Sequence, residues 1–233
     1  MMATYQEVYE AHADRYDELV DREDREKNVK HWIDRALCKR PRSSASLTVE
    51  FGCGTGRLTR YLAPHRGVVR AYDNAPHMID RARLKAAFQN VTYNVADNAK
   101  LPEADACADF VIGGWTIGHL TGFHPEGFRP LVEDVLRESR RVAKPDATMV
   151  ILETLGTCTK EPAPPNERLA ALYGMLETEW GFQREILSTD YEFSSVEEAV
   201  RVMGFFFGEP MAERVKTLNA KVVPEWTGAW FRD

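Results

Sequence analysis

Three glycines at alternate positions mark the stretch of this sequence best suited to hold a ligand. They are Gly52, Gly54 and Gly56 in VEFGCGTGRL, between an apolar run and a segment with helical spacing. The first amides of a helix lack partners within it and lie at the positive end of its dipole. Glycine also lets a ligand approach the backbone closely. The pattern predicts a small ligand over Gly52, Cys53 and Gly54, although a tight turn without a ligand would look the same.

The spacing of these glycines argues against two common nucleotide-binding loops. A dinucleotide loop follows G-x-G-x-x-G, and Arg57 stands where its third glycine belongs. A Walker loop requires Gly-Lys followed by Ser or Thr, which is absent from this stretch. NAD, FAD and ATP are therefore not expected as the ligand.

Acidic side chains are expected at the ends of three successive strands. Glu50 precedes the glycines, Asp73 ends the next apolar run, and Asp97 ends the one after it. A buried Glu50 would require a partner such as an ammonium group, and Asp73 is placed to accept hydrogen bonds from ribose hydroxyls. Asp97 is suited to an exocyclic amine. Each acid alone could be a helix cap or a turn residue, but together they describe an amino acid, a ribose and an adenine: S-adenosylmethionine.

Alternating strands and helices must position these groups. We expect strands at 47–51, 68–72, 91–95, 108–114 and 148–153, with helices at 56–63, after Asn74 and at 128–142. Such alternation predicts a parallel sheet covered by helices on both faces.

The two ends of the chain differ from this pattern. Helical spacing over 5–20 and 29–37 predicts two N-terminal helices. Towards the C-terminus we expect a helix at about 168–180, a strand in REILSTDYEF, a helix opened by Ser194 or Ser195, and a last strand in VVPEWTGAWFR. The stretch 154–181 is long for a connection, so we interpret it as part of a substrate-side cover. We thus expect a single domain, with a helical lid at 1–40, a cofactor-binding core at 47–153, and the cover with the last strands at 154–233.

The ordered set of motifs resembles the class I S-adenosylmethionine-dependent methyltransferases, in particular a small single-domain group acting mostly on small molecules. The matching stretches are VEFGCGTGRL, VVRAYDNAPHMIDRAR, NVADNAKLP, ADFVIGGWTIGHL and RESRRVAKPDATMVILET. The resemblance implies a three-layer, doubly wound α/β fold with a seven-stranded, mostly parallel sheet whose last strand is antiparallel. KPDAT departs from the usual K-P-G-G, but this loop is structural and the assignment stands.

The resemblance also implies roles for individual residues. It places Glu50 and the backbone of Gly52 and Gly54 near the methionyl end, Asp73 on the ribose, and Asp97 with Asn98 near the adenine. The other cofactor contacts that we expect are Tyr16, Cys53, Asn74, Met78, Gly113 and Trp115.

His119, in GGWTIGHL, is the candidate general base. The segment follows the fourth predicted strand, beside the expected methyl position. A base is needed only if the acceptor still carries a proton. A structural role, such as capping the next helix or bonding a backbone carbonyl, is the alternative. His124 and His119 flank a glycine and make a poor ligand pair, so no metal is expected.

Aromatic residues outside the core are candidates for acceptor binding. Tyr9 and Tyr16 share one face of the first predicted helix, and Tyr173 and Tyr191 lie in the aromatic-rich tail. We expect Tyr9, Tyr173 and Tyr191 to contact the acceptor together with His119, although packing in the core explains the same positions.

Composition narrows the partners. The 30 Lys and Arg against 36 Asp and Glu give a net charge of −6, which disfavours nucleic acid. GGWT also lacks the [DNS]-P-P-[YF] motif of enzymes that methylate base amines. No stretch approaches the ~20 apolar residues of a membrane span. Four scattered cysteines and an N-terminus without a signal core fit the cytoplasm. We expect a monomer or homodimer.

These expectations combine into one functional hypothesis. The protein would transfer a methyl group from S-adenosylmethionine to an oxygen or nitrogen of a small molecule. One alternative is an enzyme of the same fold that cyclises or cleaves the cofactor. Another is a module that binds the cofactor without catalysis.

Overall fold

A computed structural model describes residues 13–38, 46–65, 67–85 and 88–233. Tyr9 and the first part of the predicted N-terminal helix lie outside the described residues. Within them, the helical spacing predicted up to residue 20 appears as α2 (Ala13–Val20), and the second predicted helix is α3 (Asn28–Cys38).

A seven-stranded sheet organises the molecule, in the order β3-β2-β1-β4-β5-β9-β6. Its strands are β1 (Leu47–Phe51), β2 (Val68–Asp73), β3 (Val91–Val95), β4 (Ala108–Gly114), β5 (Ala143–Thr157), β6 (Gln183–Ser188) and β9 (Glu225–Arg232). Strands β1 to β5 are parallel, whereas β9 runs antiparallel to both β5 and β6. The predicted sheet with an antiparallel last strand is therefore confirmed.

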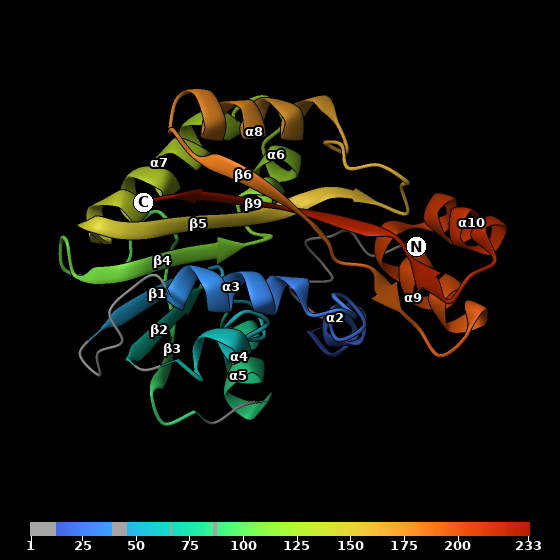
Figure 1. The fold of residues 1–233 in the computed structure, drawn as a ribbon, viewed down its shortest axis with the longest axis horizontal. Helices are drawn as coiled ribbons and strands as arrows, with labels where there is room; N and C mark the ends of the chain where they lie inside the picture. The colour runs from blue at the N-terminus through green and yellow to red at the C-terminus, as the bar shows by residue number, and fades with distance from the viewer. Residues whose placement is uncertain (1–12, 39–45, 66, 86–87) are drawn as a thin grey trace.

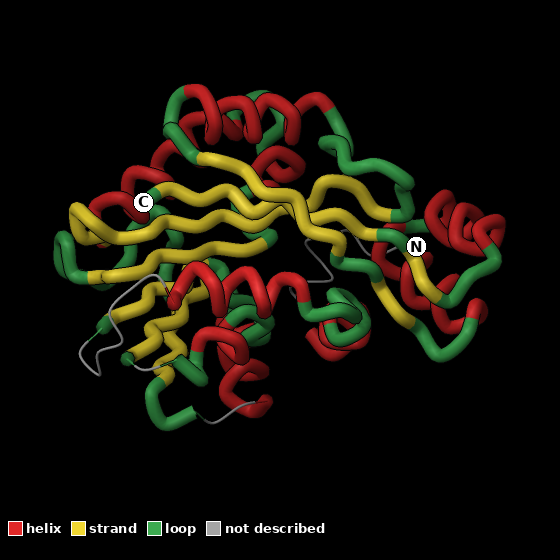
Figure 2. The backbone as a smooth tube through the Cα atoms, in the orientation of Figure 1, coloured by secondary structure: helices red, strands yellow, loops and turns green. Residues whose placement is uncertain are grey.

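Helices cover both faces of the sheet (Figures 1 and 2). One face carries α3, α4 (Thr59–Leu62) and α5 (Pro76–Lys85); the other carries α6 (Gly118–Phe123), α7 (Phe128–Val142) and α8 (Glu167–Thr178). Helix α4 is shorter than the predicted 56–63 because the turn before it contains Gly56 at φ +87°. Helix α7 ends at Val142, three residues before Pro145 of the KPD sequence, and a proline does not continue a helix.

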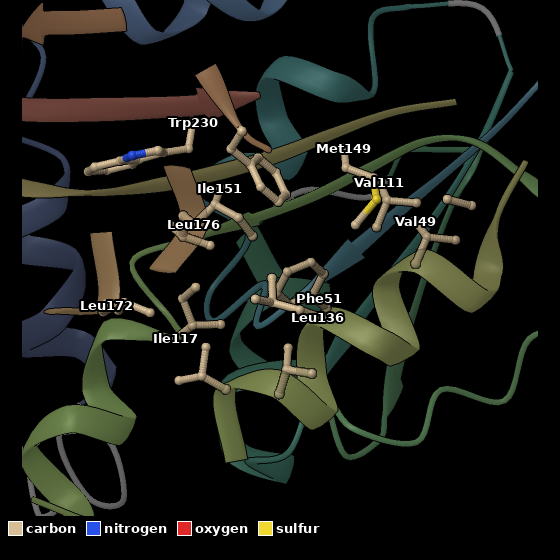
Figure 3. Close-up of a cluster of buried hydrophobic side chains, with 14 of the residues drawn as sticks. Val49, Phe51, Val111, Ile117, Leu136, Met149, Ile151, Leu172, Leu176 and Trp230 are labelled. Carbon is tan, nitrogen blue, oxygen red and sulfur yellow. The ribbon is translucent and has the colours of Figure 1, made fainter. Parts of the chain in front are cut away.

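Alternate residues of each strand supply the cores on the two faces. Val49, Phe51 and Val111 belong to the core cluster that includes Leu136 of α7, as Figure 3 shows, while Phe110 and Ile112 pack under α3 and α4. Parallel strands are buried on both faces, which explains their nearly continuous apolar sequence. The cores fix the strand register and therefore fix where each strand's carboxyl end lies.

The predicted cover at 154–181 forms a core element instead. Leu169, Leu172 and Leu176 of α8 are buried in the main core beside Ile151, so this helix is the crossover from β5 to β6. Its apolar stripe is what a crossover helix needs to pack on a sheet.

A C-terminal cap, which we define as residues 189–224, lies beyond the carboxyl end of the sheet (Figure 1). It contains β7 (Tyr191–Glu192), α9 (Val196–Phe207), α10 (Glu209–Leu218) and β8 (Val222–Val223). Ser195 caps α9 as predicted, accepting the Glu198 amide at 3.2 Å. The sequence did not indicate α10, which begins after Gly208 at φ +86°. In the part of the chain that the structure describes, no helix is long and apolar enough to cross a membrane.

Candidate functional site

The carboxyl ends of β3, β2, β1 and β4 surround a cavity of about 490 Å³. Chain order reverses at β1, with β2 and β3 on one side and β4 and β5 on the other. Ligand crevices form at such switch points because neighbouring loops leave in opposite directions. The predicted site residues that line the cavity are Tyr16, Gly52, Gly54, Asp73, Asn74, Met78, Asp97, Asn98, Trp115 and His119.

The glycine loop bounds this cavity with its backbone. Gly52 and Gly54 have φ values of +64° and +53°, which favour glycine. A Cβ on Gly52 would come within 2.2 Å of the Thr116 hydroxyl, so internal packing alone requires this glycine. A Cβ on Gly54 would face only the Tyr16 ring, at 3.9 Å. Gly54 is therefore the position where the missing side chain leaves space beside the cavity.

The amides of this loop already have partners within the protein. The Gly54 amide donates to Asp73 Oδ2 at 2.8 Å, and the Gly52 amide donates to Asn98 Oδ1 at 3.1 Å. The Cys53 amide donates to the Tyr72 carbonyl at 2.9 Å. The loop is thus held by the neighbouring strand ends, and these three amides are not the unpartnered amides that the sequence suggested.

Asp73 is oriented by two backbone amides. Its Oδ2 accepts from Gly54 and its Oδ1 accepts from Ala75 at 2.9 Å. Burial raises its pKa, and the amide hydrogen bonds act in the opposite direction. A carboxylate has about four lone-pair positions, so this half-buried group keeps acceptor capacity towards the cavity that it lines.

The end of β3 contributes two side chains with different surroundings. Asp97 is exposed and its Oδ1 accepts the Ala99 amide at 2.9 Å. Asn98 bridges two loops, because it accepts from Gly52 and its Nδ2 donates to the Thr116 hydroxyl at 3.3 Å. Asn98 therefore ties the β1 loop to the segment after β4.

The segment after β4 forms a second wall, and its backbone is fixed by β5. Trp115 has φ +49° and its amide donates to the Leu152 carbonyl at 2.6 Å. Glu153 Oε1 accepts the amides of Thr116 at 3.1 Å and Gly118 at 2.8 Å. Burial raises the pKa of Glu153 to about 7, against the effect of these amides. The sequence did not identify Glu153 as a residue that shapes this wall. The signal was available, because Glu153 ends a predicted buried strand and the same feature drew attention to Glu50.

His119 lies on this wall at the start of α6. Its ring stacks on Phe123 with 5.9 Å between ring centroids. Burial lowers its pKa to about 4, and a hydrogen bond with the Trp115 backbone acts in the opposite direction. The imidazole is therefore uncharged near neutral pH, and it is a weak base.

Helix α2 places Tyr16 over the glycine loop. Asp17 holds this helix against the glycine loop and α5. Its carboxylate accepts from the Thr55 hydroxyl at 2.6 Å, Lys85 Nζ at 2.7 Å and Arg81 Nε at 2.8 Å. Burial raises the pKa of Tyr16 to about 12, so its hydroxyl stays protonated. The lid predicted at the N-terminus thus contributes at least this one residue to the cavity.

Several predicted site residues lie away from the cavity lining. Glu50 is buried beneath the loop, where its Oε2 accepts from the Thr59 hydroxyl at 2.6 Å, and burial raises its pKa to about 8. Cys53 is also buried. A Cβ on Gly113 would meet the Phe51 ring at 2.2 Å, so this glycine serves packing, and Gly114 lines the cavity instead.

Neither of the predicted acceptor-binding tyrosines of the tail lines the cavity. Tyr173 points into the main core, where its hydroxyl donates to the Thr154 carbonyl at 2.7 Å and its ring packs on Trp230. Tyr191 is buried in the cap, stacked on Phe193. Both rings are needed to fill apolar cores, which is the alternative that the sequence left open.

The cavity also has walls that the sequence did not identify. These are Ala75, Pro76, His77, Gly114, Thr116, Ile117, Leu120, Phe123 and Val135. The lining residues that follow β2 and β4 are close in the chain to residues that we predicted. A prediction that took in the whole segment after each strand would have included them. Val135 lies within α7 and is a core position by its spacing, so no local signal marked it.

These features fit a nucleoside that carries an amino-acid tail. Asp73 offers an oriented carboxylate for hydroxyl groups, and Met78, Ile117 and Leu120 offer apolar surface for a base. Gly54 and Tyr16 both line the cavity and border the part of it where an extended tail would lie. Within the described ranges, no group of three His, Cys, Asp or Glu side chains is arranged to hold a metal ion.

Comparison with known proteins supports this interpretation. Residues 49–151 match a family model described as a methyltransferase domain. The chain is 31% identical over 125 residues to demethylmenaquinone methyltransferase of Tropheryma whipplei (strain Twist), covering 53% of this chain and 48% of that protein. It is 33% identical over 111 residues to malonyl-[acyl-carrier protein] O-methyltransferase of Anoxybacillus flavithermus, covering 46% and 42%. The chain therefore spans about half the length of the curated relatives it matches.

Solved structures show that the fold is shared over most of the chain. A SAM-dependent methyltransferase from Aquifex aeolicus superimposes with a TM-score of 0.53 at 18% identity. The superposition covers 89% of this chain and 94% of that one, including regions beyond the family match. At this identity the likeness concerns the fold alone.

Proposed function

We propose that this protein belongs to the class I S-adenosylmethionine-dependent methyltransferases and transfers a methyl group to an oxygen or nitrogen atom of a small molecule, a proposal supported by the match of residues 49–151 to a methyltransferase-domain model. The observation that supports the proposal most directly is the convergence of Gly54, Asp73 and Asp97 on one cavity at the switch point of the sheet. These residues come from three different strand ends, and they match the three parts of the cofactor.

We propose the following contacts for this cofactor. Asp73, already oriented by the Gly54 and Ala75 amides, accepts hydrogen bonds from the ribose hydroxyls. Asp97 lies on the adenine side, and Asn98 fixes the adjoining loops rather than the base. The backbone of Gly52 and Gly54, with the Tyr16 ring, surrounds the methionyl tail. When bound, the cofactor supplies an electrophilic methyl group on a sulfonium.

We assign catalysis chiefly to positioning and to the exclusion of water. In-line attack on a methyl group gains most when both reactants are held in a near-attack arrangement. His119 remains our candidate for accepting a proton, but its low pKa suits an acceptor that loses its proton readily. The acidic net charge of −6 favours a small acceptor over a nucleic acid.

The ribose contact is tested by Asp73→Asn. The substitution keeps the shape and removes the charge, so adenosylhomocysteine should bind roughly 10- to 100-fold more weakly, the effect of losing hydrogen bonds to a charged group, about 1.5–3 kcal/mol. Isothermal titration calorimetry measures this affinity. Asp80→Asn on α5, an exposed carboxylate outside the cavity, is the matched control and should bind as the wild type does. Equal affinity of Asp73→Asn and wild type would remove Asp73 from the site.

Product analysis distinguishes methyl transfer from its alternatives. Incubation with S-adenosylmethionine and a panel of hydroxyl and amine acceptors should release adenosylhomocysteine with at least one of them. Release of methylthioadenosine would instead identify an enzyme that cleaves or cyclises the cofactor. Binding without either product, across the whole panel, would support a cofactor-binding module.

A further inference from the structure

Arg57 packs flat against a wall of the cavity. Its guanidinium carbon lies 3.3 Å from the centroid of the Trp115 ring, and Trp115 lines the cavity. At this distance the guanidinium stacks on the indole face, an arrangement that combines cation–π attraction with planar packing. The sequence distinguished Arg57 only by its place after the glycines, where it argued against a dinucleotide loop.

Trp115 has an unusual backbone that needs support from its surroundings. A φ of +49° is uncommon for a residue with a bulky side chain. Such conformations persist where neighbouring structure determines them, and they concentrate at functional sites. The Trp115 amide donates to the Leu152 carbonyl of β5, and the carboxylate of Glu153 on the same strand accepts the amides of Thr116 and Gly118, which follow Trp115. Arg57 holds the side chain.

Arg57 is itself fixed by a buried ion pair with the turn after α2. Its Nη2 lies 2.6 Å from Glu23 Oε1, and the two side chains are 9% and 3% exposed. A buried ion pair contributes little net stability compared with apolar residues of similar volume. Its geometry, in contrast, is strict, because a planar guanidinium between a carboxylate and an indole has one orientation. This arrangement suits a positioning role better than a stabilising one.

We propose that Arg57 is a positioning residue that holds the Trp115 indole as a wall of the cofactor cavity, and that Glu23 fixes Arg57 in this orientation. The inference rests on the proposed function of the cavity. Glu23 also neutralises the guanidinium, so that the cavity wall carries no uncompensated positive charge close to a cationic sulfonium. The turn after α2 does not line the cavity, but through Arg57 it fixes the position of Trp115, which does.

A similar arrangement three residues further along the chain provides a matched control. Arg60 lies over the Tyr61 ring at 4.9 Å, and its Nη1 lies 3.1 Å from Asp21, near Glu23 in the chain. Arg60 is 36% exposed and Tyr61 does not line the cavity. Arg60→Met therefore removes the same chemical group three residues later in the chain, away from the site.

The test is a double-mutant cycle on adenosylhomocysteine affinity, measured by calorimetry at a temperature where every variant is folded. Arg57→Met should weaken binding about tenfold, and Trp115→Phe should also weaken it. The variant with both substitutions should bind no more weakly than Trp115→Phe alone, because Arg57 acts through the indole. Arg60→Met should bind within about twofold of wild type. Wild-type affinity in Arg57→Met, or fully additive losses in the double variant, would overturn the proposal.

Two further variants keep the test decisive if Arg57→Met does not fold. Arg57→Lys retains the charge but loses the planar stack, and Glu23→Gln removes the carboxylate charge while keeping the side chain's shape. Each should weaken binding less than Trp115→Phe, and wild-type affinity in both would overturn the proposal. Failure of the wild type to bind adenosylhomocysteine would instead contradict the proposed function, a result distinct from any outcome within the cycle.

Discussion

Single residues in this protein show how burial decides what an acidic side chain does. Asp73 is the last residue of β2, and Glu50 is the last but one of β1. Asp73 is half-buried on the cavity wall, whereas Glu50 is 1% exposed beneath the loop. A fully buried carboxyl favours its neutral form because ionisation there loses hydration. The two acids therefore have different roles despite similar sequence positions.

Glu50→Gln should make the protein more stable than wild type as the pH rises from 5 to 8. Burial raises the pKa of Glu50 from 4.5 to about 8, so in this window the folded state holds a proton that the unfolded chain has lost. Wild-type stability then falls with pH by up to about 1.4 kcal/mol per pH unit from this group. Glutamine stays neutral and removes that loss. Urea unfolding at several pH values measures it.

The same variant tests whether Glu50 contacts the methionyl end of the cofactor, the role that the resemblance implied. Since Glu50 lies outside the cavity, Glu50→Gln should bind adenosylhomocysteine with wild-type affinity. A large loss of affinity would mean that an ionised Glu50 meets the ammonium group after all. Glu161→Gln, a change at an exposed glutamate, is the control for stability and should show no trend with pH relative to wild type.

At the scale of elements, the ends of β4 and β5 build one wall together. Glu153 of β5 accepts the amides of Thr116 and of Gly118, the first residue of α6, so the position of this carboxylate helps to fix where the helix begins. Gly118 fits there because a Cβ would lie 2.6 Å from Glu153 Oε2. The path of the chain from β4 into α6 thus depends on a residue from the neighbouring strand.

Two glycines of α6 should respond in opposite ways to alanine. Gly118→Ala forces a clash with Glu153 and should cost about 1–3 kcal/mol of stability, as overpacking does. Gly122→Ala meets no atom within 4 Å and should be neutral or stabilise by up to about 1 kcal/mol, through helix propensity. Urea unfolding compares them, and adenosylhomocysteine affinity should fall only for Gly118→Ala. Equal effects of the two changes would contradict the steric argument.

At the scale of the whole molecule, α2 lies between the sheet core and the C-terminal cap. Asp17 joins it to α5 and the glycine loop, while Glu18 pairs with Arg201 of α9. Tyr16 contacts both the sheet core and the cap, since it covers Gly54 of the glycine loop and packs near Phe206 of the cap. The position of the cap is therefore linked to the cavity through this one helix.

Asp17→Asn should loosen α2 from the core more than Glu18→Gln loosens it from the cap. Asp17 is buried and has three partners, so losing its charge should cost about 3 kcal/mol. Glu18 and Arg201 are partly exposed, and such pairs contribute at most about 1 kcal/mol. Hydrogen exchange of residues 13–20 should accelerate in Asp17→Asn and change little in Glu18→Gln. Similar exchange in both variants would show that the Asp17 contacts do not hold the helix more strongly than the Glu18 pair does.

Local sequence determined much of this protein. The apolar runs predicted the five parallel strands, and the turn residues between them predicted the helices, because strand and helix periodicity are local properties. The glycine loop with Asp73 and Asp97 predicted the site for the same reason: each residue follows its own strand, and parallel strands end at a common edge.

Only the tertiary structure decided which candidates reach the cavity. Glu50, Tyr173 and Tyr191 are buried by elements distant in the chain, and α8, within the stretch 154–181, packs in the main core. Glu153, Val135 and the pairing of Arg57 with Trp115 and Glu23 likewise depend on contacts between separate elements. Burial and side-chain partners are long-range properties, so periodicity and spacing along one chain do not contain them.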